Sequence, residues 1–118
     1  MAINMTRILV TGGAGYIGSH IVEQLIKKAN FIKADIRKKS QIIKIIKDNN
    51  ITSIIHLAAY LNVSEAEKNK KKYFRNNIVG TKNLLEACKN ANVKNIIFSS
   101  SCSIYGNVKG SVDENRKP

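Results

Sequence analysis

An apolar run that leads directly into closely spaced glycines constrains the fold of this chain more than any other feature. Ile8-Leu9-Val10 is followed by Thr11-Gly12-Gly13-Ala14-Gly15-Tyr16-Ile17-Gly18, and apolar residues then recur at helical spacing between positions 17 and 26. A buried strand, a glycine turn and a helix in this order are typical of the βαβ unit that binds a dinucleotide. An ordinary strand-to-helix turn without a ligand is the alternative interpretation.

Three of these glycines have separate physical tasks. Gly12 lets the chain turn sharply as it leaves the strand, Gly15 lets the backbone approach phosphate groups, and Gly18 lets the helix pack tightly on the sheet. The helix then begins with N–H groups directed at the pyrophosphate, at the end that carries partial positive charge. The pattern predicts a pyrophosphate site and leaves the reaction open.

Length and charge limit the other classes of function. The chain of 118 residues predicts one domain and is short for a two-domain dehydrogenase. Its formal net charge of +12 would suit a nucleic-acid or acidic-membrane partner. However, the basic residues are scattered, with one tight run at Lys70-Lys71-Lys72, and no aromatic side chain is interleaved in that run to stack on bases. We therefore expect solvated lysines and no nucleic-acid partner.

The two cysteines indicate a reducing compartment. Cys88 and Cys102 are far apart, without a Cys-x-x-Cys motif or a cluster of metal ligands, so we expect two packing residues and no metal site. No apolar run approaches the roughly 20 residues of a membrane span, and no secretory leader pattern opens the chain. We expect a soluble cytoplasmic protein with no membrane partner.

Alternating elements predict the fold class. We expect strands at residues 7–10, 31–35, 52–57 and 95–99, and helices at 16–28, 41–48 and 73–90. This order requires a parallel sheet with right-handed crossovers. The prediction is an α/β, Rossmann-like domain over residues 1–109 with about four strands and flanking helices, followed by a frayed tail at 110–118. The strand at 31–35 is expected to pair beside the strand at 7–10.

The sequence also predicts a helix cap, a buried helix face and the state of the two histidines. Ser40 resembles an N-cap for the helix at 41–48. The helix at 73–90 is expected to contact the core through four apolar residues: Ile78, Leu84, Leu85 and Ala87. His20 and His56 are expected to be packed or hydrogen-bonded neutral imidazoles, because no metal ligand or nucleophile lies at a telling spacing from either.

Five sequence blocks resemble one family, in the family's own order. They are Thr11–His20, Ala34-Asp35-Ile36-Arg37, His56-Leu57-Ala58-Ala59, Asn76–Thr81 and Phe98–Gly106. Together they resemble the extended short-chain dehydrogenase/reductases, the NAD-dependent epimerases and dehydratases of nucleotide sugars. The likeness is greatest to members that interconvert UDP-glucose and UDP-galactose, and sister epimerases and dehydratases share much of it.

The resemblance implies NAD as cofactor and a nucleotide sugar as the family's substrate. It implies that phosphate-binding glycines and backbone at the helix start hold the cofactor, that an Asp-Ile pair contacts adenine, and that other backbone and one asparagine line the groove. These residues are Gly12, Gly15, Tyr16, Ile17, Gly18, Asp35, Ile36, Ala58, Ala59 and Asn76. It also implies that Ser101 is a catalytic hydroxyl that binds the reacting sugar oxygen, an assignment that rests on the resemblance alone.

Two departures from the family point to a truncated, internally deleted form. The family's base is a tyrosine in a Tyr-x-x-x-Lys helix, whose lysine lowers the pKa of the tyrosine. We expect that helix and the substrate domain to be missing, and Tyr105 is not that tyrosine. The family's second strand, whose acidic end binds the adenosine ribose, also has no counterpart. We therefore expect an inactive remnant; a stand-alone NAD-binding module, or a fragment of another nucleotide-sugar enzyme, is the alternative.

Asp35 allows three interpretations. Its distance from Gly18 is close to the roughly 20 residues at which a Rossmann fold places its ribose-binding acid. Its neighbours Ala34, Ile36 and Arg37 instead match the family segment whose Asp faces adenine. The third interpretation is an exposed Asp that caps a turn near Ser40.

Overall fold

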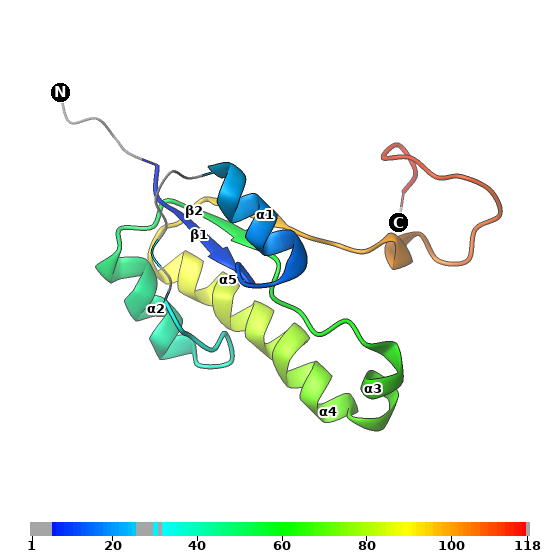
Figure 1. Cartoon of the computed structure of the whole chain (residues 1–118), viewed down its shortest axis with the longest axis horizontal. Helices are drawn as coiled ribbons and strands as arrows, with labels where there is room; N and C mark the ends of the chain where they lie inside the picture. The colour runs from blue at the N-terminus through cyan, green and yellow to red at the C-terminus, as the bar shows by residue number, and fades with distance from the viewer. Residues whose placement is uncertain (1–5, 26–29, 31, 118) are drawn as a thin grey trace.

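Three parallel strands form the sheet of the computed structural model, which describes residues 6–25, 30 and 32–117 (Figure 1). The strands are β1 (Ile8–Thr11), β2 (Ser53–His56) and β3 (Asn95–Phe98), in the spatial order β1-β2-β3. Thr11 lies opposite His56, and His56 lies opposite Phe98. Because the three strands end in register, the segments that follow them leave the sheet along one edge.

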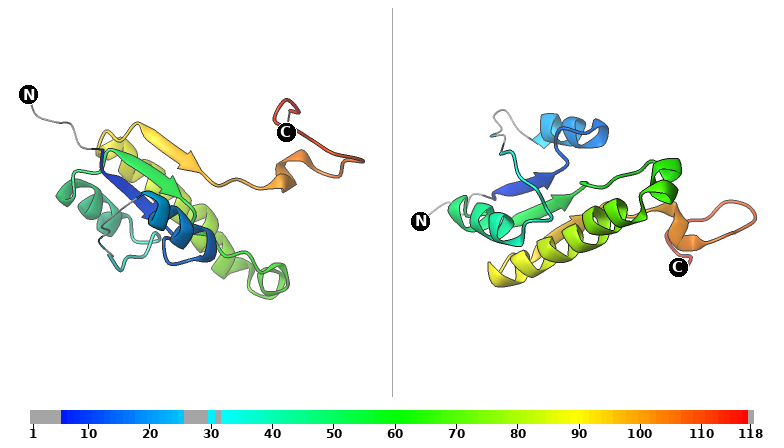
Figure 2. Two further views of the ribbon diagram at one scale, coloured as in Figure 1. Left: turned by 45° about the horizontal axis from the view of Figure 1, so that its top comes forward. Right: turned by 90° about the horizontal axis from the view of Figure 1, so that it is seen from below.

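Helices lie on both faces of the sheet. Helix α1 (Tyr16–Leu25) lies on one face, and α2 (Lys39–Asp48) and α5 (Thr81–Asn90) lie on the other (Figure 2). Between β2 and α5 the chain forms α3 (Val63–Lys68), α4 (Lys70–Tyr73) and the π-helical segment η1 (Phe74–Gly80). The segments α4, η1 and α5 follow one another without a break. The Rossmann-like α/β fold class is thereby confirmed.

Among the described residues, the hydrophobic core fills one face of the sheet. It lies between the sheet and helices α2 and α5 and consists of Ile36, Ile42, Ile46, Ile54, Leu84, Ala87, Cys88 and Val93. All four residues of β3 are exposed, and Ile97 and Phe98 retain 64% and 58% of their accessible surface. Strand β3 is an edge strand of the described sheet, with no neighbour beyond it among residues 6–25, 30 and 32–117.

The predicted strand at 31–35 does not form. Phe31 lies outside the described residues, and residues 32–35 are irregular, so the described sheet has three strands instead of four. Ile36 is buried in the core under α5, and Asn83 of α5 donates a hydrogen bond to Arg37 O at 3.0 Å. The segment is therefore anchored to a helix, and its apolar residues need no partner in the sheet.

Two helical predictions are also corrected. Helix α2 begins at Lys39, before Ser40, and its cap position is Lys38, which makes no capping side-chain hydrogen bond. The helix predicted at 73–90 begins earlier, at Lys70, where α4 starts. Helix α1 ends at Leu25, and the predicted continuation to Lys28 lies outside the described residues.

The predicted core face of the long helix is half right. Leu84 and Ala87 are fully buried, whereas Ile78 and Leu85 are 56% and 49% exposed. Adjacent residues point about 100° apart around a helix, so Leu84 and Leu85 cannot both face a core that covers one side. Ile78 and Leu85, seven positions apart, share the side that faces away from it.

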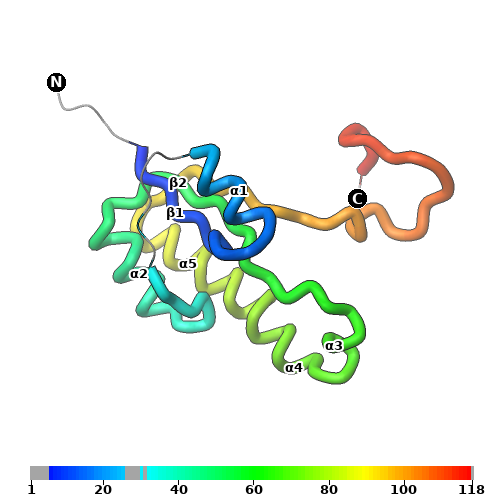
Figure 3. Tube along the Cα trace, in the orientation of Figure 1, coloured from blue at the N-terminus to red at the C-terminus, as the bar shows by residue number. Residues whose placement is uncertain are grey.

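Residues 99–117 leave the sheet and extend away from it, with one short 3-10 turn, η2 (Cys102–Tyr105) (Figure 3). Residues 110–117 contain no helix or strand. The domain boundary after residue 109 and the frayed character of the tail stay predictions. Among the described residues, no helix has both the length and the apolar character that crossing a membrane requires.

Candidate functional site

The glycine turn lies at the carboxyl edge of the sheet and is held by close backbone contacts. Gly12 has φ of 74°, in the left-handed region, and a Cβ there would lie 2.9 Å from the backbone nitrogen of Ala58. Only glycine satisfies both the conformation and the space. The turn after β1 is thus fixed against the segment that follows β2.

Gly15 and Gly18 bring helix α1 onto this turn. The N–H of Gly15 donates to Gly12 O at 2.9 Å, and a Cβ on Gly18 would lie 2.8 Å from the carbonyl carbon of Gly12. The side chains of Tyr16 and Ile17 are 84% and 57% exposed, so the first turn of α1 faces solvent. The N–H groups of a first helical turn have no partner within the helix, and such an end attracts anions.

His56 connects three elements beneath this edge. Its Nδ1 is 2.6 Å from Thr11 Oγ1 on β1, and its Nε2 is 2.9 Å from Thr81 Oγ1 on α5. The side chain is 3% exposed, and burial lowers the pKa of the imidazole from 6.5. The expectation of a packed, hydrogen-bonded imidazole is confirmed, and the direction of the pKa shift favours the neutral form. His20, in contrast, is 64% exposed and lies edge-on to the Tyr16 ring.

The segment after β2 forms the opposite wall of the candidate groove. Ala58 is half-buried against the core and Ala59 is exposed. The Asn77 side chain binds both backbone groups of Tyr60, the residue after Ala59. Its Oδ1 accepts from Tyr60 N and its Nδ2 donates to Tyr60 O, each at 2.9 Å. Asn76 is half-buried and its Nδ2 donates to the same Asn77 Oδ1 at 3.0 Å.

Asp35 caps a turn through Arg37. Its Oδ1 accepts from the Arg37 backbone N–H and from Nε, both at 2.9 Å, and its Oδ2 accepts from Nη2 at 2.7 Å. The guanidinium contacts, and next the backbone N–H, lower the pKa of Asp35 from 3.8 to about 2. Of the three interpretations, this arrangement corresponds to the turn-capping one. The side chain of Ile36 is in the core, so only its backbone is left for contact with a ligand.

Ser101 lies in the segment that follows β3. It caps the short turn η2: its Oγ accepts from Ser103 N at 3.2 Å and donates to Ser103 Oγ at 3.1 Å. The spacing Tyr105-x-x-x-Lys109 does occur in the chain. However, Gly106 follows at φ of 66° and no helix extends from 106 to 109, so Lys109 is not held one helical turn from Tyr105.

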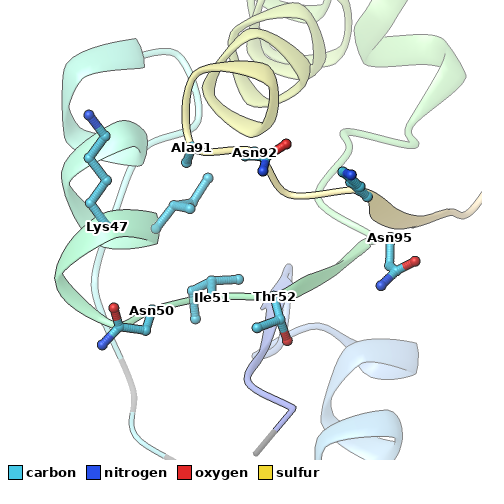
Figure 4. Close-up of a pocket in the computed structure, with 9 residues that line it drawn as sticks. Lys47, Asn50, Ile51, Thr52, Ala91, Asn92 and Asn95 are labelled. Carbon is cyan, nitrogen blue, oxygen red and sulfur yellow. The ribbon is translucent and has the colours of Figure 1, made fainter. Parts of the chain in front are cut away.

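A hollow also lies elsewhere in the described structure (Figure 4). It is open, has a volume of about 510 Å³, and lies at the amino ends of β2 and β3, where Thr52 and Asn95 line it. Ligands of open parallel sheets bind at the carboxyl ends, so this hollow is not the candidate site. Within the described part of the chain, no three His, Cys, Asp or Glu residues are grouped as metal ligands.

Comparison with known proteins decides the family. The sequence model of the NAD dependent epimerase/dehydratase family matches residues 8–118. The chain belongs to this family. It is 40% identical over 121 residues to the UDP-glucose 4-epimerase of Lactobacillus helveticus, an alignment that covers 85% of this chain and 37% of that protein. It is 38% identical to the bifunctional protein GAL10 of Candida maltosa, over 85% of this chain and 84% of that one.

Solved structures give the same result for this family member. The UDP-glucose 4-epimerase of Brucella ovis in complex with NAD has a TM-score of 0.87 at 30% identity, and the match covers 96% of this chain and 41% of that one. The Thermus thermophilus enzyme complexed with NAD also has a TM-score of 0.87, at 32% identity, over 96% and 44%. The chain thus spans about two-fifths of the length of these full-size relatives, and the predicted family resemblance is confirmed.

In this epimerase/dehydratase family member, some of the predicted site residues contact one another and others do not. Gly12 packs against Ala58, and Gly15 and Gly18 pack against Gly12. Asp35, in contrast, is bonded to Arg37, and Ser101 to Ser103. Thr11, Asn77 and Thr81 support this edge and are not among the predicted site residues. One signal was available: Asn77 and Thr81 are four residues apart and therefore share a helix face.

Proposed function

We propose that this chain binds NAD at the carboxyl edge of its sheet, as the cofactor-binding part of a UDP-glucose 4-epimerase-type protein. The observation that carries the proposal is the turn at Gly12, where no Cβ fits against Ala58 and the exposed start of α1 follows directly. This cradle suits a pyrophosphate, because backbone N–H groups reach it without side chains in the way. The protein is proposed to act in the cytoplasm without a nucleic-acid or membrane partner.

The individual residues have proposed tasks. Backbone groups of Gly12, Gly15, Tyr16, Ile17 and Gly18 bind the pyrophosphate. The backbone of Asp35 and Ile36 faces the adenine, because the Asp35 carboxylate is held by Arg37 and the Ile36 side chain is in the core. Ala58 and Ala59 line the groove with backbone, and Asn76 lies near the cofactor. The Ser101 hydroxyl binds the reacting oxygen of a nucleotide sugar. When bound, NAD supplies a site that accepts a hydride and can return it.

We further propose that the chain alone does not interconvert UDP-glucose and UDP-galactose. Removal of the sugar proton needs a base with a lowered pKa, and a tyrosine obtains one from an adjacent cation. Gly106 ends the turn that contains Tyr105 and no helix follows through Lys109, which supports the proposal that Tyr105 and Lys109 do not form such a pair. A coupled assay with purified protein, NAD and UDP-galactose is expected to give no UDP-glucose; turnover would overturn this part of the proposal.

Calorimetric titration with NAD tests the binding proposal. We expect saturable heat of NAD binding with the unaltered protein. Gly15→Ala should bind NAD more weakly, because its methyl group would separate the backbone from the phosphates. Gly13→Ala is the matched control, because its Cβ would make an ordinary contact 3.4 Å from Val22 Cγ2. Absence of heat at millimolar NAD, with protein shown to be folded by circular dichroism, would overturn the proposal.

A further inference from the structure

The buried ring of His56 is bonded at both nitrogens to hydroxyl groups from other elements. Thr11 Oγ1 lies 2.6 Å from Nδ1 and Thr81 Oγ1 lies 2.9 Å from Nε2. The Phe98 ring stacks on the imidazole with centroids 5.7 Å apart. The ring therefore joins β1, β2 and α5 at the edge where the glycine turn begins.

The direction of each hydrogen bond follows from counting protons. The Thr81 hydroxyl has one proton, and it donates that proton to Asn77 O at 2.7 Å. Thr81 Oγ1 can then only accept from His56, so Nε2 carries the ring proton. In a neutral imidazole Nδ1 is then bare, and it accepts from the Thr11 hydroxyl.

This assignment determines where the lone pairs of Thr11 point. With its proton committed to His56, Thr11 Oγ1 faces the backbone N–H groups of Leu57 and Ala58 as an acceptor, at 3.3 and 3.4 Å. The Ala58 nitrogen is also the atom against which Gly12 packs. The hydroxyl therefore lies at the joint between the glycine turn and the segment after β2.

We propose that His56, in its neutral Nε2–H form, is a positioning residue for the cofactor groove. It orients the Thr11 hydroxyl, which holds the Leu57–Ala58 backbone against Gly12, and it does so from beneath the turn without touching the cofactor. That the groove binds a cofactor rests on the proposed function. The positioning of the Leu57–Ala58 backbone is a property of the ligand-free protein.

The same chain of hydrogen bonds fixes the far end of this wall. Thr81 is bonded to Asn77 O, and the Asn77 side chain holds both backbone groups of Tyr60. The segment from Ala58 to Tyr60 is therefore held at one end through Thr11 and at the other through Asn77. His56 and Thr81 link the two ends.

Nitrogen-15 NMR of the imidazole tests the tautomer in ligand-free protein at neutral pH. We expect a bare Nδ1 and a protonated Nε2 for His56. A ring protonated at Nδ1, or at both nitrogens, would overturn the inference. Since no NAD is present, this result stands whether or not the protein binds the cofactor.

Paired variants at Thr81 test the positioning. Thr81→Val removes the acceptor for Nε2–H and is expected to speed amide hydrogen exchange at Ala58 and to weaken NAD binding about fivefold, as expected for loss of one hydrogen bond. Thr81→Ser keeps the hydroxyl and should retain both properties. The amide of Leu84 in the core serves as the reference for global unfolding.

The outcomes separate the two proposals. Faster exchange at Ala58, with Leu84 unchanged and Thr81→Ser normal, supports the inference even when no NAD binds. Unchanged exchange at Ala58 in folded Thr81→Val would overturn it, even when NAD binds normally. Should Thr81→Val fail to fold, Thr11→Val and Thr11→Ser provide the same comparison from the other side of the ring.

Discussion

Gly12 faces Ala58 so closely that a β-carbon at position 12 would lie 2.9 Å from the backbone nitrogen of Ala58. The opposing atom is backbone, which cannot rotate away as a side chain can. The turn after β1 and the segment after β2 therefore constrain each other through main-chain atoms alone.

Gly12→Ala should destabilise the fold. The alanine would have to adopt φ near 74° and displace Ala58, and such strain costs about 1–3 kcal/mol. Urea denaturation followed by circular dichroism would measure the change. Gly13→Ala provides the control. Equal urea midpoints for the two variants would contradict the conclusion that a Cβ does not fit at position 12.

Acid should weaken the protein through His56. Burial lowers the pKa of this imidazole from 6.5, so the unfolded chain binds the proton more tightly than the folded one. The contribution of the neutral ring is fully present above pH 6.5 and is lost as the pH falls below that value. We expect the urea concentration at the midpoint of unfolding to decrease as the pH is lowered from 7 to 5. A His56→Gln variant should show a flatter dependence; an identical slope would exclude His56 as the cause.

The Asp35 carboxylate should titrate differently when Arg37 is removed. With a folded pKa of about 2 against 3.8, the pair contributes stability above pH 3.8 that is lost as the pH falls toward 2. Arg37→Ala is expected to raise the pKa of Asp35, which carbon-13 NMR of the carboxyl can follow. Lys38→Ala is the control, since Lys38 is the weakest contributor. The stability cost of Arg37→Ala should be small, because solvent screens an exposed ion pair.

Gly80→Ala should destabilise a helical segment that alanine usually favours. A Cβ at Gly80 would lie 2.7 Å from both Cδ1 and Cγ1 of Ile36, which is itself buried. Overpacking of this kind costs about 1–3 kcal/mol. In an Ile36→Val background, which lacks Cδ1, the penalty should shrink. A double-mutant cycle by thermal denaturation measures the coupling, and additive effects would argue against contact between the two residues.

Neighbouring leucines on α5 should respond in opposite ways. Leu84 is completely buried, so Leu84→Ala should cost about 2–5 kcal/mol. Leu85 is 49% exposed and Leu85→Ala should stay within about 0.5 kcal/mol. Equal losses in chemical denaturation would mean that the exposed side of α5 is covered in solution.

Local backbone chemistry explains which features could be predicted from sequence. The glycine turn was predictable because each glycine answers a steric need within a few residues of itself. Strands β2 and β3 were predictable as apolar runs between turn residues. The failure at residues 31–35 has a tertiary cause, because Ile36 packs under α5 and Asp35 closes a turn with Arg37. Apolar residues alone do not distinguish a strand from a segment anchored to a helix.

The supports of the candidate site depend on register, which sequence does not display. Thr11 and His56 meet because β1 and β2 pair residue for residue, and Thr81 joins them from a helix that crosses beneath. Residue spacing therefore could not have indicated that these three polar groups form one chain of hydrogen bonds. The positions predicted from the family resemblance at Asp35, Asn76 and Ser101 remain predictions.

In the described sheet β3 is an edge strand, and this affects how the protein behaves at high concentration. An edge strand with exposed Ile97 and Phe98 is a template on which another copy can add a strand. A net charge of +12 on every copy opposes that encounter through long-range repulsion. In about 1 M salt the repulsion reaches only about 3 Å. The lysines therefore act as a colloidal stabiliser, and ionic strength, more than temperature, is expected to set the concentration at which this protein precipitates.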